Sequence, residues 1–417
     1  MEEKSTVLSA SEKNNKETMM KALLMGEQTT LPLVLRHLLK LRHGQLIFKG
    51  AWEGVVGEHS DLQATIHVHD TRLMDLVFRQ GVLGAAEGYI RGYWTSDHLV
   101  NVVRILARNR DVLDQMNQST VAKLSQYLLK GWYKTRKNSI EGSRKNIAEH
   151  YDLSNDFFKL FLDPSMMYSS AVFKEPCMSL EQASDYKKEL ICQKLNLQPM
   201  DHVVEIGSGW GGFAIYAAQH YGCSVTTITI SQAQYDEAVA RVQAAGLSHR
   251  VFVHLKDYRA MEGKFDKLVS IEMIEAVGEQ YLPTYFQQCR QLLKPNGLAL
   301  IQAITIEDAR YSKALNTIDY IKRYIFPGSF IPCISVMTLE ASKQQLRLKQ
   351  LEDIGQSYAQ TIHHWRANFL QQREQVKKLG FDEQFMRMWD FYLCYCEGGF
   401  REGVISDVHL LFEASNY

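Results

Sequence analysis

The residues best suited to bind a ligand form a glycine-rich run directly after an apolar segment. We predict a buried strand, then a turn, then the start of a helix over the run Val203-Val204-Glu205-Ile206-Gly207-Ser208-Gly209-Trp210-Gly211-Gly212. Glycine adopts positive φ readily and leaves no Cβ between the main chain and a ligand. The first amides of the helix would face a ligand at the carboxyl end of the strand. The spacing G-x-G-x-G-G differs from the dinucleotide pattern. It predicts a ligand loop, with a tight turn that binds nothing as the simpler alternative.

Polar residues follow the next two predicted strands, at the same edge of the sheet. Thr229, Ser231 and Gln234 come after the second strand and can hydrogen-bond a ribose or an amino-acid group. That segment holds no carboxylate of the kind that dinucleotide enzymes place there, and Ser231 fits a helix N-cap equally well. Asp257, just before Tyr258, can accept a hydrogen bond from an adenine amino group, or it can stabilise a turn.

These side chains need a sheet whose strands end side by side, and the chain predicts one. From about residue 148, predicted strands and helices alternate as in a doubly wound α/β fold. Strands are predicted at His202–Ile206, Ser224–Ile230, Val251–Leu255, Lys267–Glu272, Gly297–Thr305, Leu346–Asp353 and Val404–Phe412. Helices are predicted at Gly212–His220, Gln232–Ala245 and Leu282–Leu293, followed by a turn at Lys294-Pro295-Asn296-Gly297.

The part of the chain before the sheet has a different pattern. Residues 1–28 are polar and predict a flexible tail, and residues 29–120 predict a small α+β domain. Its strands and helices are predicted at Gln45–Phe48, Gln63–Val68, Thr71–Gln80 and Asp97–Arg108. A basic helical linker is expected over 121–147 and a catalytic domain over 148–417. The cations of the linker form either a solvated face or a contact with anionic lipid headgroups.

Composition places the chain among globular enzymes and excludes several other classes. It has 417 residues, 46% of them hydrophobic, and 47 basic residues balance 47 acidic ones, so no net charge attracts nucleic acid. The polar N-terminus does not fit a secretory signal, and no apolar run reaches the roughly 18 residues of a membrane span. The seven cysteines lack metal-ligand spacing, which favours a reducing cytoplasm and no metal site.

Several motifs together make the chain resemble the cyclopropane-fatty-acyl-phospholipid synthase family, relatives of the mycolic acid cyclopropane synthases. The glycine run resembles motif I of the S-adenosylmethionine (SAM) methyltransferases. The other motifs lie at His150–Phe158, Leu162–Pro164, Met167–Ala171, Glu272–Gly278, Arg323–Gly328 and Tyr395–Phe400. The resemblance extends from about residue 30 to the C-terminus. It implies a doubly wound SAM-dependent methyltransferase fold with a reversed last strand, behind a small N-terminal domain that faces lipid.

The resemblance also implies a cofactor and a reaction. SAM would be held by Tyr168, Ser169, Glu205, Gly207, Gly209, Gly211, Thr229, Ser231, Gln234, Asp257 and Tyr258. Its methyl group would pass to a carbon of a cis double bond in an acyl chain, and the resulting carbocation would lose a proton to close a ring. Aromatic faces stabilise a cation, and such faces could come from Tyr168 and Tyr358, and from Tyr324 and Phe326 at the substrate. Each of these rings could instead be core packing.

The family uses a bound bicarbonate ion as the proton acceptor. By position, its holders here would be Glu275, Ser170, Gln302, the backbone of Ile304, and Tyr358. Glu275 can accept the bicarbonate hydroxyl, while the other groups donate hydrogen bonds to its oxygens. Ser170 stands where a cysteine is common and Gln302 where a histidine is common, and both replacements keep a donor. Glu275 could instead be a structural carboxylate at the start of a helix.

The implied partners are a phospholipid membrane surface and the unsaturated acyl chains in it, with no nucleic acid and with a second copy in a homodimer. The implied location is the cytoplasm, at the inner face of the cytoplasmic membrane. A related SAM-dependent lipid C-methyltransferase that leaves a methyl or methylene branch is the alternative within enzymes. A small-amine methyltransferase is disfavoured by the N-terminal domain. A catalytically silent lipid-binding relative is disfavoured by the intact glycine loop and Glu275.

Overall fold

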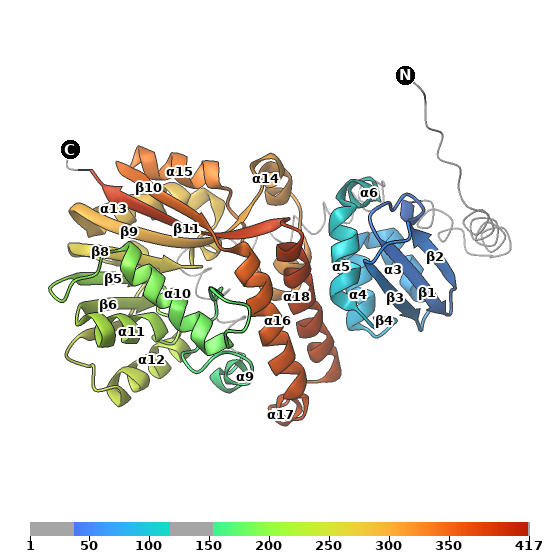
Figure 1. Ribbon diagram of the computed structural model, residues 1–417, viewed down its shortest axis with the longest axis horizontal. Coiled ribbons are helices and arrows are strands. Elements are labelled where there is room, and N and C mark those ends of the chain that lie inside the picture. Colours follow the sequence, from blue (N-terminus) through green and yellow to red (C-terminus); the bar gives the residue numbers. More distant parts are fainter. Residues whose placement is uncertain (1–36, 117–152, 416–417) are drawn as a thin grey trace, which may run out of the picture. The chain divides into compact units, whose positions relative to one another are not determined.

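The computed structural model describes residues 37–116 and 153–415, which divide into two compact units (Figure 1). The first unit comprises the described residues up to 116 together with Glu383–Phe391. The second comprises residues 153–382 and Tyr392 onward. The predicted tail (1–28) and basic linker (121–147) lie outside the described residues. No helix in the described ranges is long and apolar enough to cross a membrane.

The first unit is built on a four-stranded sheet with the order β2-β1-β3-β4. Strand β1 pairs antiparallel with β2 and parallel with β3, and β4 pairs antiparallel with β3. The elements are β1 (Gln45–Gly50), β2 (Gly54–Gly57), β3 (Gln63–Val68), α3 (Arg72–Gln80), α4 (Val82–Ile90), β4 (Trp94–Ser96), α5 (Leu99–Arg108) and α6 (Arg110–Met116). The two strands and two helices predicted here are present, with α5 beginning two residues later than expected.

The second unit is built on a seven-stranded sheet with the order β10-β11-β9-β8-β5-β6-β7. The strands from β9 to β7 run parallel, whereas β11 is antiparallel to both β9 and β10. The strands are β5 (His202–Ile206), β6 (Ser224–Thr229), β7 (Val251–Leu255), β8 (Phe265–Ile271), β9 (Leu293–Ile306), β10 (Leu346–Asp353) and β11 (Ile405–Ala414). The doubly wound fold and the reversed last strand are as predicted.

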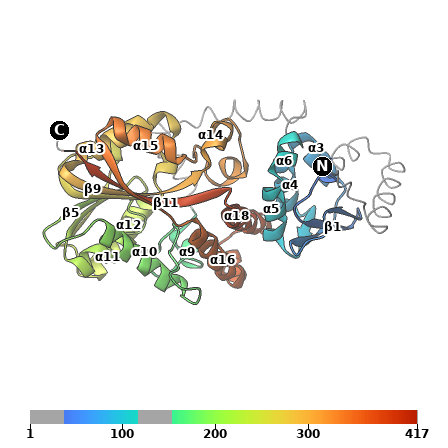
Figure 2. The same ribbon diagram turned by 45° about the horizontal axis from the view of Figure 1, so that its top comes forward.

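Helices cover both faces of this sheet, because adjacent strand residues alternate between two cores. Val203 of β5 packs in the core with α10 (Leu180–Lys194), α11 (Gly212–Tyr221) and α12 (Gln232–Ala244). Its neighbour Val204 packs in the core with α13 (Leu282–Leu292) and α15 (Ile334–Lys343). The two layers are visible in Figures 1 and 2, where α13 and α15 lie on one side of the sheet and α10 and α11 on the other.

The remaining elements precede or connect the strands of this sheet. They are α9 (Asn155–Lys159), η1 (Tyr258–Ala260), η2 (Ile274–Ala276), η3 (Glu279–Tyr281), α14 (Asp308–Leu315), the π-helix η4 (Ile321–Ile325), α16 (Gly355–Gln371), α17 (Arg373–Lys378) and α18 (Glu383–Arg401). The start of α18, residues Glu383–Phe391, belongs to the first unit. The turn predicted after α13 is an irregularity inside β9. Its pairing with β8 jumps there from Leu293 to Leu298, and Asn296 has a φ of +61°.

Candidate functional site

The predicted ligand loop has the open backbone that its glycines require. Gly207, Gly209 and Gly211 all have positive φ, at +95°, +49° and +84°. The loop is held at its start, where the amides of Gly207 and Ser208 donate to the carbonyl of Ile228 on β6 at 3.0 and 2.9 Å. A Cβ at Gly209 would meet nothing within 4 Å, whereas one at Gly212 would lie 2.5 Å from the carbonyl oxygen of Ser165. The loop is therefore open at Gly209 and tightly packed at Gly212.

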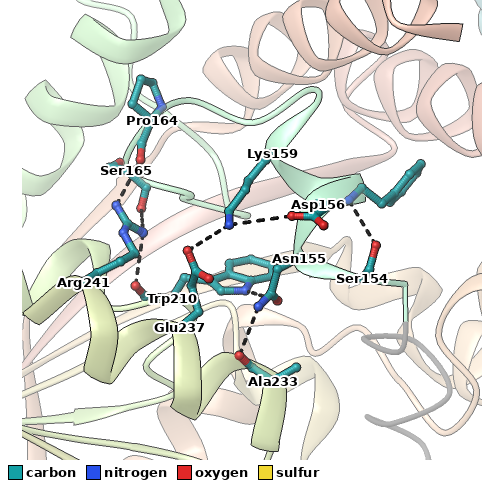
Figure 3. Close-up of polar contacts among 11 residues, drawn as sticks. Ser154, Asn155, Asp156, Lys159, Pro164, Ser165, Trp210, Ala233, Glu237 and Arg241 are labelled. Carbon is teal, nitrogen blue, oxygen red and sulfur yellow. Dashed lines mark hydrogen bonds and ion pairs between the residues drawn. The ribbon is translucent and has the colours of Figure 1, made fainter. Parts of the chain in front are cut away.

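Residues of the segment before the sheet, among them Asn155 and Ser165, hold this loop through hydrogen bonds (Figure 3). Trp210 donates its indole N–H to Asn155 of α9 at 2.8 Å. Arg241 of α12 donates to the carbonyl oxygens of Ser165 and Trp210 at 3.0 and 3.1 Å. The motifs at His150–Phe158 and Leu162–Pro164, where the structure describes them, thus hold the glycine loop in place.

The polar residues predicted after β6 form a closed local network. Ser231 is the N-cap of α12, since its hydroxyl accepts from the amide of Gln234 at 3.3 Å. Thr229 donates its hydroxyl to Oε1 of Gln234 at 2.9 Å and accepts from the amide of Ser231 at 3.1 Å. The N-cap alternative for Ser231 is therefore observed, and the same bonds fix the orientation of the Gln234 amide.

The acidic residues predicted to bind the cofactor lie in different surroundings. Glu205 is 2% exposed and accepts from the Thr227 hydroxyl at 2.5 Å. Burial raises the pKa of Glu205 to about 8, opposed by that bond and by the charge of Lys187. Asp257 caps η1 and pairs with Arg259 at 2.7 Å, which is the turn role considered for it. The hydroxyl of Tyr258 is buried and has no hydrogen-bond partner among the described residues.

Three residues predicted to hold an anion converge on one carboxylate, that of Glu272, which directly follows β8. Ser170 donates its backbone N–H to Oε1 at 2.7 Å, and Gln302 of β9 donates Nε2–H to the same oxygen at 2.8 Å. Tyr358 of α16 donates its hydroxyl to Oε2 at 2.6 Å. Burial raises the pKa of Glu272, while the charge of Lys187 and the Tyr358 bond act against this rise.

The orientation of the Gln302 amide is set by a chain of hydrogen bonds behind it. Its Nε2 also donates to Asp407 of β11 at 2.7 Å, so both of its N–H groups point at carboxyls. Its Oε1 lies 3.3 Å from Nε2 of His409, whose Nδ1 lies 2.7 Å from the ammonium of Lys194. Lys194 can only donate, so Nδ1 accepts and Nε2 carries the proton. Burial lowers the pKa of His409 well below its usual value, which keeps the ring neutral.

Glu275 lies in η2, three residues after Glu272, and it is bound differently. Its Oε1 accepts from the backbone N–H of Ile304 at 2.6 Å, so two groups predicted to hold bicarbonate bond to each other. Its Oε2 is buried and has no partner among the described residues. Burial and the charge of Glu272 raise the pKa of Glu275 to about 8, so at neutral pH this carboxyl holds a proton.

Sequence reasoning missed three charged residues at this site: Lys187, Glu272 and Asp407. The Lys187 ammonium is fully buried and donates to the hydroxyl of Ser169 at 2.6 Å. Burial lowers its pKa to about 8, opposed by Glu272 and Asp407. Lys187 lies four residues after Ala183 and four before Ile191 of α10, both fully buried. That spacing was the available signal for its inward position.

The predicted aromatic residues fall into two groups. Tyr168 packs against Trp365 with ring centroids 5.3 Å apart, and Tyr358 lies 6.0 Å from the same ring and stacks on Phe400 at 4.4 Å. The Tyr168 hydroxyl lies 3.0 Å from that of Tyr392.

The two rings assigned to the substrate belong to, or follow, the π-helix. Phe326 contacts Tyr392 with ring centroids 6.2 Å apart and so borders the group around Tyr168. Tyr324 packs against Tyr320 with ring centroids 5.3 Å apart. Tyr168, Tyr358 and Phe326 thus belong to one connected aromatic set.

The chain matches one protein family over most of its length. The family model described as mycolic acid cyclopropane synthetase matches residues 138–410. Tuberculostearic acid methyltransferase UfaA1 of Mycobacterium tuberculosis is 38% identical over 335 residues, which cover 78% of this chain and 78% of that protein. The cyclopropane-fatty-acyl-phospholipid synthase of Escherichia coli is 33% identical over 342 residues, which cover 81% of this chain and 85% of that protein.

Solved structures give the same result. Mycolic acid cyclopropane synthase CmaA1, complexed with SAH and CTAB, matches with a TM-score of 0.61 and 28% identity, covering 65% of this chain and 98% of that one. The cyclopropane synthase MmaA2 from Mycobacterium tuberculosis matches with a TM-score of 0.61 and 27% identity, over the same shares of the two chains.

Proposed function

Since the chain belongs to the mycolic acid cyclopropane synthetase family, we propose that it cyclopropanates cis double bonds in unsaturated acyl chains of membrane phospholipids. Family membership confirms the resemblance, the fold and SAM-dependent methyl transfer as predicted from the sequence. The acyl substrate, the lipid headgroup and the ring product are the parts proposed here.

The residues around the glycine loop fit SAM. The loop is open at Gly209, and the buried hydroxyl of Tyr258 has no partner among the described residues. Glu205 lies near the carboxyl end of β5 and Gln234 lies in α12, just after β6, at the edge of the sheet where a nucleoside is bound in doubly wound folds. When bound, SAM supplies an electrophilic methyl group. The chain itself supplies alignment, which a weakly nucleophilic alkene requires.

The observation that carries the proposal is the buried Glu272 carboxylate with its three donors. An alkene that accepts a methyl cation becomes a carbocation, and the reaction ends only when a proton is lost. A buried carboxylate close to Tyr358, with the ring of Phe400 stacked on that tyrosine, provides a proton acceptor and aromatic faces together. Methylation of an amine or a hydroxyl creates no carbocation that must lose a C–H proton.

A second candidate is a methyl or methylene branch in place of the ring. The observation that favours it is the 38% identity to a tuberculostearic acid methyltransferase, compared with 33% to the Escherichia coli synthase. Both products start from the same cation. Loss of a proton from the added methyl group closes a ring. A 1,2-hydride shift that moves the cation to the methylated carbon, followed by loss of a methyl proton, leaves a methylene branch.

Lipid analysis of an expressing host tests the proposal. The host makes unsaturated phospholipids but no cyclopropane lipids, and its fatty acid methyl esters are separated by gas chromatography with mass detection. A new ester that has gained one CH₂ and resists mild hydrogenation is the expected ring. An ester of the same mass that takes up hydrogen is a methylene branch. No ester with an added carbon means that the proposed substrate is wrong.

Attachment to a membrane surface is part of this proposal, because the acyl chains lie in a bilayer. We propose peripheral attachment at the inner face of the cytoplasmic membrane, by a homodimer. The support is the run of cations over 121–147 in the sequence, where each cation near an anionic surface adds about 1 kcal/mol.

A further inference from the structure

We propose that Glu272 is the base that removes the substrate proton, so that the chain supplies the carboxylate which the family resemblance assigns to bicarbonate. This inference rests on the proposed function, since the proton comes from the methylated acyl chain. It also removes bicarbonate from the expected cofactors, so that SAM is the small molecule that the reaction requires.

The donors predicted for bicarbonate do not fit a separate ion. The Ser170 amide, the Gln302 amide and the Tyr358 hydroxyl already donate to the two oxygens of Glu272 at 2.6 to 2.8 Å. The Ser170 hydroxyl donates to the carbonyl of Ala171 at 2.8 Å. The fourth predicted donor, the amide of Ile304, is taken by Glu275. Each of the four predicted donors is therefore engaged by the protein itself.

The backbone at Glu272 also sets this residue apart. Its φ is +47°, in the left-handed region that favours glycine and that a long side chain rarely adopts. Its own amide donates to the carbonyl of Gln302 at 2.9 Å, which ties the residue to β9. Non-glycine residues held in this region concentrate at functional sites, where the surrounding structure enforces the conformation. Here the conformation brings the carboxylate to the three donors.

Gln302 matches a protein carboxylate better than a histidine would. Its amide gives one N–H to Glu272 and one to Asp407, whereas a histidine ring in its place would reach only one carboxyl with one N–H. The chain from Lys194 through His409 prevents the amide from turning its oxygen toward the carboxyls. The departure from the family at position 302 is therefore explained by a carboxylate that belongs to the chain.

Hydrogen bonds and a nearby charge favour the anionic form of Glu272 within the cluster. Burial raises the pKa of Asp407 well above its usual value, and it raises the pKa of Glu275 to about 8. Glu272 accepts three hydrogen bonds, which stabilise its anionic form. Lys187 adds a positive charge, and burial keeps the pKa of Glu272 raised, which strengthens it as a base.

The proton balance of the step is complete without another reactant. The methyl–sulfur bond of SAM breaks with its electron pair on sulfur, and the methyl carbon bonds to one alkene carbon. A C–H bond of the added methyl group, which sits on the carbon beside the cationic one, then breaks. Its electrons form the last C–C bond of the ring, and the proton moves to the Glu272 carboxylate. The neutral acid returns the proton to water when the product leaves.

The test compares bicarbonate dependence in three proteins. Wild type is expected to form the lipid product at the same rate, within about twofold, in CO₂-free buffer and with added bicarbonate. Glu272→Gln, which keeps the shape but loses the base, is expected to lose at least a hundredfold in both buffers. Glu272→Gly frees the three donors and suits the positive φ, so we expect it to be inactive in CO₂-free buffer and at least tenfold faster with bicarbonate. Glu262→Gln, at an exposed position, is the matched control.

Binding of isotope-labelled bicarbonate, followed by NMR, reports on the site without any lipid. Glu272→Gly should bind the ion and wild type should not. A wild type that needs bicarbonate would overturn the assignment of Glu272 as the base, and so would a Glu272→Gln variant with at least half of the wild-type rate. Neither result would overturn the proposed function. Thermal unfolding and SAM titration of each variant establish that it is folded. A wild type that forms no lipid product would overturn the proposed function, and this inference would fall with it.

Discussion

Replacing Glu205 by glutamine is expected to stabilise the second unit, although it weakens the cofactor site. The Glu205 carboxyl is 2% exposed, and burial raises its pKa from 4.5 to about 8. Below pH 4.5 the proton is bound in the folded and unfolded states alike. Between pH 4.5 and 8 the unfolded chain releases it and the folded chain keeps it, so stability falls as the pH rises.

The size of this effect follows from the width of that window. At neutral conditions, pH 7 lies about 2.5 units above the pKa of Glu205 in the unfolded chain. Each unit corresponds to about 1.4 kcal/mol, so the buried carboxyl lowers the free energy of unfolding by on the order of 3 kcal/mol. Glutamine can keep the 2.5 Å hydrogen bond from Thr227 without this penalty. We therefore expect Glu205→Gln to be about 3 kcal/mol more stable than wild type at pH 7, and about equal to it near pH 4.5.

Hydrogen exchange of the β5 and β6 amides in urea measures this quantity for the second unit by itself, since the two units can unfold separately. Glu262→Gln, the same change at an exposed position, is the control and should follow wild type. SAM affinity should fall in Glu205→Gln while stability rises. If wild type and Glu205→Gln show the same change in stability between pH 5 and pH 7, the reasoning from burial is wrong.

Three further predictions concern the anion cluster, the glycine loop and the membrane. Glu275→Ala, which removes the acceptor of the Ile304 backbone N–H, should leave SAM binding intact and reduce turnover at least tenfold in the lipid assay, and full activity would remove Glu275 from the site. Gly212→Ala places a Cβ 2.5 Å from the Ser165 carbonyl oxygen and should weaken SAM binding, measured by calorimetry, far more than Gly209→Ala does. The Cβ of Gly209→Ala meets nothing within 4 Å and adds only about 1 kcal/mol of left-handed backbone strain. Equal losses of SAM affinity would contradict the packing described for the loop. Purified protein should sediment with anionic vesicles more than with neutral ones at low salt, and equal sedimentation would rule out an electrostatic role for the cations of residues 121–147.

The framework of the second unit could be predicted from the sequence because its signals are local. The predicted bounds of β5, β7 and β10 match the observed bounds residue for residue, because short segments with apolar residues, bounded by turns, mark these strands. The reversed β11 was expected from the resemblance. By contrast, α10 was not predicted, and with it Lys187 was missed. A buried lysine runs against the usual preference of this residue for the surface, and only its neighbours four residues away point to the interior.

The centre of the site depends on contacts between distant segments, which residue types do not reveal. Glu272 stood in a quoted motif without a role, because its role requires a left-handed backbone and donors from β9, α16 and the segment before α10. Ser170 was expected to act through its hydroxyl and instead donates its backbone amide to Glu272. Such an amide contact carries no signature in the sequence. Asp407, on the reversed strand, was missed for the same reason.

The most direct measurement is the rate of lipid product formation by wild type and Glu272→Gln in CO₂-free buffer. The account predicts that wild type adds one carbon to the acyl double bond there at the same rate as with bicarbonate, while Glu272→Gln does not. A wild-type enzyme that stops without bicarbonate, or a Glu272→Gln enzyme that keeps pace with it, would contradict the account.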